Sequence, residues 1–245
     1  MTESATGLIL RTRPLTETSL IVHWLTPQSG RMATVAKGAR RAKSPFLGKL
    51  DLFYLADFSF SRSRRSDLHT LREVSLRDPH SALRQDIQRL RQAAYAATFI
   101  EQATETETPL PAVFELMTGF LDCLCHHPPA SPMVFAFELK FLHVLGLKPD
   151  PDKIKLTAGA KQIVRTLAQG HWPEVLRLKL TTAQTDELRQ FLHGFLIFHL
   201  GRLPGGRAGA LADNQTCDPV HPNIPHSSSN PSYPARTIDG QPEYK

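Results

Sequence analysis

The chain of 245 residues is poor in cysteine and has no long apolar run. Its three thiols (Cys123, Cys125 and Cys217) lack the spacing of a disulfide framework, so we expect no disulfide and a reducing compartment. No apolar run reaches the roughly 18 residues that cross a bilayer. The N-terminus also lacks a basic segment followed by an apolar core. These absences predict a soluble, cytoplasmic protein with no membrane partner.

Short motifs of common enzyme chemistry are also missing. The sequence has no glycine-rich phosphate loop, no Gly-x-Ser-x-Gly and no paired-carboxylate motif on neighbouring strands. Cys123 and Cys125, followed by two histidines, are too few for zinc because no second ligand pair follows at zinc spacing. We therefore expect no catalytic residue, no metal and no cofactor. A thiol hydrolase that uses Cys125 and His126 stays open as a minor alternative, without a nearby acid to orient the histidine.

Positive charge is concentrated in one stretch of the chain. Between Arg31 and Arg65, nine basic residues face two acids, an excess of seven in a chain whose net charge is +6. A local excess favours a binding surface for a polyanion, with solvated surface charge as the ordinary alternative. We expect nucleic-acid binding through phosphate contacts. The candidate residues are Lys37, Arg40, Arg41, Lys43, Arg62, Arg64 and Arg65, with Arg11, Arg13 and Lys49 less certain.

The first third of the chain alternates apolar and polar residues, which is the period of strands with one buried face. Turn residues separate five predicted strands, at 7–14, 19–25, 31–36, 50–61 and 68–76. Five such strands predict a small antiparallel barrel, and alternation alone does not separate an OB barrel from an SH3-like one. The basic segments 37–43 and 62–65 both fall at strand ends, so sheet geometry could join them into one patch.

Aromatic residues gather in the fourth predicted strand. Alternation places Tyr54, Phe58 and Phe60 on one face, which predicts a barrel core. Stacking on nucleic-acid bases is the alternative for these rings. Phe46 is the best stacking candidate because it follows a proline inside the basic segment.

After residue 79 the apolar spacing changes to threes and fours, which is typical of helices. Helices are predicted at 82–104, 111–125, 132–145, 156–168 and 182–203, the first with Ser81 as N-cap. Residues 191–200 are all apolar, His or Gly, so we expect that helix to be largely buried. The chain is therefore α+β, with a barrel domain at 1–79, an all-α bundle at 80–212 and a disordered, proline-rich tail at 213–245.

Several segments resemble the RecO family of bacterial DNA repair proteins. They are residues 7–13, 17–22, 30–31, 35–41 with Ser44, 71–74, 145–149 and 199–203. The most specific is Lys37-Gly-Ala-Arg40 followed by serine. The resemblance covers about residues 7 to 212, and it implies an OB fold followed by a helical bundle.

The resemblance also implies a function and partners. It implies a non-enzymatic, nucleoid-associated mediator that binds single- and double-stranded DNA, anneals complementary strands and remodels coated single strands for RecA loading. The implied partners are RecR and the acidic, apolar C-terminal tail of single-stranded-DNA-binding protein. Helices 132–147 and 182–203, with Lys140, Lys148, Arg189 and Arg202 nearby, are expected to receive that tail.

Two points limit what the resemblance implies. Many family members have a four-cysteine zinc motif where residues 150–156 here contain no cysteine, so we expect no zinc. A generic OB-fold RNA-binding module with a helical protein-interaction domain stays open as the alternative function.

Overall fold

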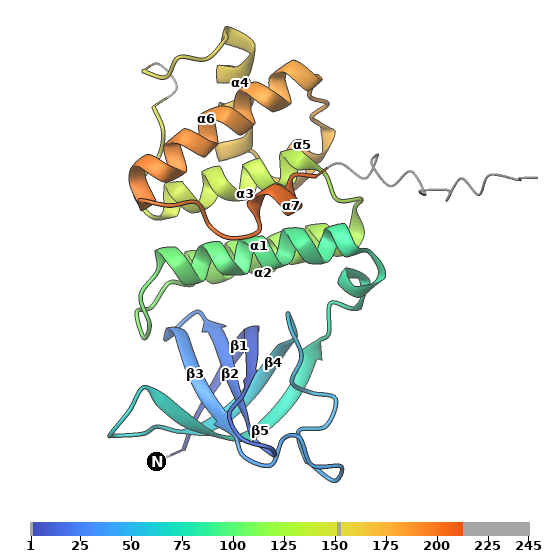
Figure 1. The fold of residues 1–245 in the computed structure, drawn as a ribbon, viewed down its shortest axis with the longest axis vertical. Helices are drawn as coiled ribbons and strands as arrows, with labels where there is room; N and C mark the ends of the chain where they lie inside the picture. Colours follow the sequence, from blue (N-terminus) through green and yellow to red (C-terminus); the bar gives the residue numbers. More distant parts are fainter. Residues whose placement is uncertain (1, 151–152, 213–245) are drawn as a thin grey trace, which may run out of the picture. The chain divides into compact units, whose positions relative to one another are not determined.

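The protein was studied as a computed structural model, which describes residues 2–150 and 153–212. Five strands come first, and they pair in the closed order β1-β2-β3-β5-β4 (Figure 1). The β3–β5 pair is parallel and the other four pairs are antiparallel. The expectation of a wholly antiparallel sheet was wrong, because strand directions can alternate around a closed ring only when the number of strands is even. The strands are β1 Thr2–Pro14, β2 Leu20–Thr26, β3 Gly30–Ala36, β4 Leu55–Ser61 and β5 Leu68–Asp78.

The barrel has an aromatic core. Trp24 stacks on Phe58 with ring centroids 4.1 Å apart, and its indole N–H donates a hydrogen bond to the hydroxyl of Thr34 at 2.8 Å. Phe58 and Phe60 are buried, as alternation predicted. Phe46 is also buried in this core, with 6% of its surface exposed, so its prediction as an exposed stacking platform was wrong.

The fourth strand begins later than predicted, at Leu55. The preceding residues form a turn in which Phe53 takes the left-handed conformation, with φ 63°. Its ring is buried in a second core, which Leu8, Leu10 and Leu25 of the barrel share with the helices. Tyr54 is half-buried beneath the guanidinium of Arg84, at 4.8 Å from the ring centre. The barrel and the helices are therefore packed through one continuous apolar interface.

A short 3₁₀ turn (Ser81–Gln85) leads into the helical part, where α1 and α2 lie between the strands and the later helices (Figure 1). The carboxylate of Asp86 accepts a hydrogen bond from the amide of Gln88 at 2.7 Å and caps α1. One continuous helix capped by Ser81 was therefore a wrong prediction. The helices are α1 Ile87–Ala103, α2 Pro111–His126, α3 Ser131–Val144, α4 Ala158–Gln169, α5 Trp172–Arg177, α6 Thr182–Leu200 and α7 Arg207–Ala210.

Helix α6 is an amphipathic surface helix. Its buried residues are Leu188, Leu192 and Leu196, a single stripe at four-residue spacing. Phe198 has 83% of its surface exposed and Ile197 has 41%. The prediction of a largely buried helix was wrong, because an apolar composition does not reveal that a helix lies at the edge of the bundle.

The short helix α7 is anchored by a buried ion pair. The guanidinium of Arg207 donates to Glu138 of α3 at 2.6 Å, and both side chains are buried. The amide group of Gln88 donates to the carbonyl oxygens of Gly209 and Ala210 at 3.0 and 2.9 Å. These contacts fix the last described residues to α1 and α3. The predicted tail, 213–245, lies outside the described residues.

Within the part of the chain that the structure describes, no helix combines the length and the hydropathy needed to span a bilayer.

Candidate nucleic-acid interface

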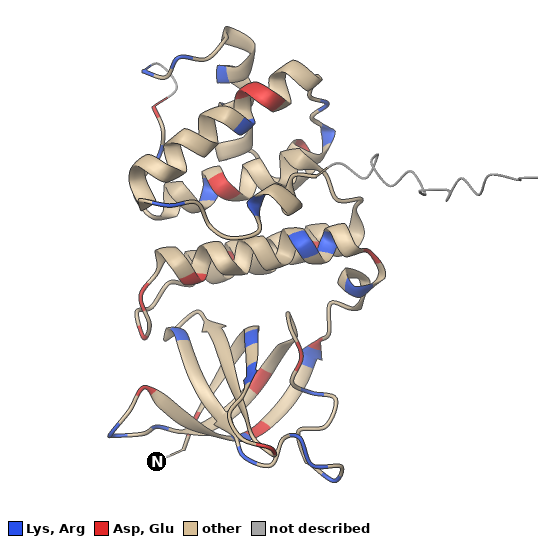
Figure 2. Ribbon diagram, in the orientation of Figure 1, with Lys and Arg blue, Asp and Glu red and all other residues tan. Residues whose placement is uncertain are grey.

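Two basic loops join the strands of the barrel. The first, which we call segment 37–43, follows β3, and the second, loop 62–67, joins β4 to β5. Figure 2 shows these two groups of basic residues at opposite sides of the barrel. Sheet geometry therefore does not join them into one patch, and each group is considered by itself.

Segment 37–43 has a fixed backbone, and among its four cations only Arg40 donates a side-chain hydrogen bond within the described residues, to the carbonyl oxygen of Thr16 at 3.3 Å. The amide of Arg40 donates to the carbonyl oxygen of Thr18 in the β1–β2 turn at 3.0 Å. Gly38 takes the left-handed conformation, with φ +71°, which glycine adopts without strain. Four cations (Lys37, Arg40, Arg41 and Lys43) are exposed, and none forms an ion pair with another described residue. The arrangement presents four positive charges on a braced loop.

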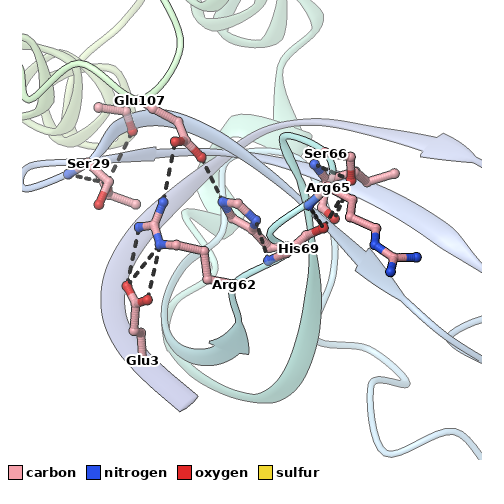
Figure 3. A network of polar contacts seen from close by, with 11 residues as sticks. Glu3, Ser29, Arg62, Arg65, Ser66, His69 and Glu107 are labelled. Carbon is pink, nitrogen blue, oxygen red and sulfur yellow. Dashed lines mark hydrogen bonds and ion pairs between the residues drawn. The ribbon is translucent and has the colours of Figure 1, made fainter. Parts of the chain in front are cut away.

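Loop 62–67 is anchored by its first residue. The guanidinium of Arg62 donates to Glu3 at 3.0 Å and lies 3.3 Å from the carboxylate of Glu107 (Figure 3). The hydrogen bond from Arg62 lowers the pKa of Glu3, and the same bond raises the pKa of Arg62. Arg62 therefore holds β1, loop 62–67 and the α1–α2 connection together, which gives it a structural role.

His69 extends this network beneath the loop (Figure 3). Its ring is 2% exposed, and Nδ1 accepts a hydrogen bond from the amide of Ser63 at 3.2 Å. Because Nδ1 is the acceptor, Nε2 carries the proton and donates to Glu107 at 2.7 Å. Glu107 thus binds two partners from the barrel, and it does so from a left-handed backbone conformation with φ 54°.

The remaining candidates also include exposed cations without ion pairs and cations held by other parts of the protein. Arg64, Arg65 and Arg13 are exposed, and within residues 2–150 and 153–212 they form no ion pair. Arg11 pairs with Glu101 of α1, so it joins the barrel to the helices. Lys49 is half-buried beside a cavity of about 430 Å³ that two acids, Asp57 and Glu73, also line. The two acids offset the two cations of the lining, Lys49 and Arg72, so the cavity offers no excess of positive charge to a polyanion.

The connection between α1 and α2, residues 104–110, covers one edge of β3. The guanidinium of Arg31 donates to the hydroxyl of Thr104 at 2.8 Å, and burial lowers the pKa of Arg31. The amide of Glu107 donates to the carbonyl oxygen of Arg31 at 2.8 Å. A Cβ on Gly30 would lie 1.8 Å from the carbonyl oxygen of Thr108, so only glycine fits. Arg31 is therefore structural, although its charge contributed to the predicted basic stretch.

Cys123 and Cys125 of α2 do not have the properties of nucleophiles. Burial raises the pKa of Cys123 to about 11 and also raises the pKa of Cys125. A reactive thiol needs a lowered pKa, so these raised values argue against the thiol-hydrolase alternative. The expectation that no acid lies near His126 was wrong, because Asp122, one helical turn earlier on α2, lies 3.2 Å from its Nδ1. The described residues contain no group of three His, Cys, Asp or Glu side chains placed to hold a metal. That the protein carries no zinc stays a prediction, which elemental analysis of the purified chain tests.

Comparison with known proteins covers both parts of the fold. Residues 1–80 match the family model described as Recombination protein O N terminal, and residues 84–154 match Recombination protein O C terminal. A protein named DNA repair protein RecO from Anaeromyxobacter sp. (strain K) is 32% identical over 231 residues, which covers 80% of this chain and 91% of that protein. Its namesake from Bacillus pumilus (strain SAFR-032) is 31% identical over 147 residues, 60% of this chain and 57% of that protein.

Proposed function

Because the chain belongs to the RecO family of DNA repair proteins, we propose that it is a non-enzymatic recombination mediator that binds DNA through segment 37–43. The observation that carries this proposal is the set of four exposed cations without ion pairs on a braced loop. We assign the barrel to the OB fold, whose five-stranded barrels bind oligonucleotides through their loops. Contacts of this kind neutralise phosphates and read no sequence, so single- and double-stranded DNA are both ligands.

Strand annealing follows from the same charges. Two complementary strands repel each other through their phosphates until base pairs form. Cations that bridge two backbones reduce this repulsion and stabilise the first pairs. Annealing by this mechanism needs charge and surface only, without a catalytic group.

Salt dependence tests the site. If about five phosphates are neutralised, the slope of log K against log salt on single strands is expected to be roughly −3 to −4. Replacing Arg40, Arg41 and Lys43 by Ala should reduce the magnitude of the slope by about 2. The same variant should weaken binding to DNA of every sequence to the same extent. A control triple that replaces the exposed Lys155, Arg177 and Lys179 of the helical part by Ala should leave the slope unchanged.

Two outcomes would contradict this proposal. If the variant that lacks Arg40, Arg41 and Lys43 bound DNA at low salt with unchanged affinity, segment 37–43 would not be the DNA-binding site. A marked preference for RNA over DNA would favour the alternative of a generic RNA-binding module. An annealing assay with single-stranded-DNA-binding protein on the strands then separates a mediator from a simple DNA-binding protein.

We propose RecR and the tail of single-stranded-DNA-binding protein as partners, and only the second suggests a surface. An acidic tail with an apolar end requires exposed apolar side chains near cations. Helix α6 offers Phe198, which is 83% exposed, and Arg202 follows it on the exposed surface. Lys140 and Arg189 are less suitable than predicted, because they donate to the carbonyl oxygens of Ala168 and Leu211.

The matched pair Phe198→Ala and Ile87→Ala tests this surface. Both residues are exposed apolar side chains, and Ile87 lies on α1. Titration of a tail peptide against the whole protein should show weaker binding for Phe198→Ala and unchanged binding for Ile87→Ala. Equal affinity of both variants for the peptide would mean that the tail does not bind at α6.

A further inference from the structure

The turn between β1 and β2 and segment 37–43 enclose a shallow cavity of about 360 Å³. No carboxylate lines it, in contrast to the cavity beside Lys49. Glu17 belongs to the same turn, but its side chain is exposed and lies outside the lining. The lining residues are Leu15, Thr16, Thr18, Ser19, Val35, Lys37, Gly38 and Arg41.

Neutral hydrogen-bond donors stand beside the two cations in this cavity. Ser19 is 9% exposed, and its hydroxyl has no hydrogen-bond partner within the described residues. Thr18 also lines the cavity, and its hydroxyl forms no hydrogen bond within the described residues. The hydroxyl oxygen of Thr16 is instead occupied, because it accepts from the amides of Thr18 and Ser19 at 3.3 and 3.1 Å. The hydroxyl of Ser19 is accessible from the cavity, so it is free to donate to a ligand that accepts hydrogen bonds.

We propose that this cavity is a phosphate subsite that holds one phosphodiester of a bound DNA strand. Lys37 and Arg41 neutralise the charge, and the hydroxyls of Thr18 and Ser19 donate hydrogen bonds to the phosphate oxygens. Leu15, which is 45% exposed at the rim, faces the adjoining sugar. The inference rests on the proposed DNA binding and deepens it, because it assigns uncharged residues of the β1–β2 turn to the site.

The walls of the subsite are fixed before a ligand arrives. The hydrogen bond from the amide of Arg40 to the carbonyl oxygen of Thr18 joins the two loops at 3.0 Å. The turn itself is closed by hydrogen bonds from the amides of Leu15 and Thr16 to the carbonyl oxygen of Ser19, at 2.9 and 3.4 Å. Little backbone order is then lost on binding, which favours affinity.

A variant that removes hydroxyls without changing charge tests the subsite. The double variant Thr18→Val/Ser19→Ala of the whole protein should bind a short single-stranded DNA on the order of a hundredfold more weakly, because each of the two lost bonds was made to a charged group. The slope of log K against log salt should stay that of the wild type, since no cation is removed. Thr182→Val is the control, because Thr182 is exposed on α6 far along the chain from both loops.

The outcomes separate this inference from the proposed function. If the wild-type protein fails to bind DNA, the proposed function is wrong. If the wild type binds and the double variant binds equally well, the function stands and the subsite is wrong. Should the double variant melt at a lower temperature, Ser19→Ala alone, the smaller change, takes its place, with an expected loss of affinity of about tenfold.

Inorganic phosphate provides a second measurement on the whole protein. In an NMR titration, phosphate should shift the amide signals of Thr18, Ser19 and Gly38, and chloride at equal ionic strength should not. The shifts should disappear in the variant Lys37→Ala/Arg41→Ala. Equal shifts with both salts would overturn the subsite.

Discussion

Segment 37–43 and loop 62–67 have similar sequences and different surroundings. Each carries closely spaced arginines between two strands of the same barrel. The cations of segment 37–43 face solvent, whereas loop 62–67 begins with an arginine held by Glu3 and Glu107. The difference comes from acids supplied by distant parts of the chain. Positive charge in a sequence therefore identifies a binding surface only when no remote acid neutralises it.

The largest expected effect concerns a cation that is fully buried. Replacing Arg207 by Met leaves the buried carboxylate of Glu138 without a cation and with only the hydroxyl of Tyr95 as a hydrogen-bond donor, so the free energy of unfolding should fall by about 3–5 kcal/mol. Urea denaturation measures this loss. The salt slope of DNA binding should not change, because Arg207 lies in the helical part. A loss well below 1 kcal/mol would mean that the pair contributes little to holding α7.

A second pair of variants compares a free cation with an anchored one. Arg41→Ala should weaken binding to single-stranded DNA several-fold and reduce the magnitude of the salt slope by about 0.7. Arg62→Ala should leave the slope near its wild-type value, since the guanidinium of Arg62 is already engaged by two carboxylates. Fluorescence anisotropy over a range of salt concentrations measures both. Equal slopes for the two variants would mean that the free and the anchored arginine contribute equally to DNA binding, and the difference between the two loops would then have no functional consequence.

Arg62→Ala should instead lower the free energy of unfolding. The pair is partly exposed, so the loss near neutral pH is expected to be about 1 kcal/mol. The pKa of Glu3 in the folded protein lies below its ordinary value of 4.5 because of Arg62. The contribution is therefore present above that ordinary value and is lost as the pH falls through the lowered pKa. Melting temperatures of wild type and variant should differ at pH 7 and converge in acid, and a constant difference would exclude this pairing.

The smallest expected effect is that of the tail. Truncation after Ala212 removes no cation of either loop and keeps α7 with its anchors. We expect no core within the removed residues, because their sequence contains many prolines and few, scattered apolar side chains. Melting temperature and DNA annealing should be nearly unchanged. A large drop in either would show that residues beyond 212 bind to the rest of the protein.

Sequence reasoning found the elements whose periodicity repeats and missed the features that depend on distant contacts. Five strands and the longer helices were predicted because alternation and three-to-four spacing run through them. The role of Arg62 was not predictable, because Glu107 and Glu3 lie 45 and 59 positions away along the chain. The residues of the proposed phosphate subsite were missed for a related reason. Its hydroxyls lie in a turn before β2 and its cations follow β3, and only the fold brings them together.

The positions of the first and last described residues determine how the protein is best attached to a surface or a label. Thr2 pairs with Ser61, directly before loop 62–67, so a tag at the N-terminus would crowd Arg64 and Arg65. Helix α7, which ends two residues before Ala212, lies among the helices and away from the strands (Figure 1). Immobilisation through a tag placed after Ala212 would therefore present the whole barrel to an approaching strand.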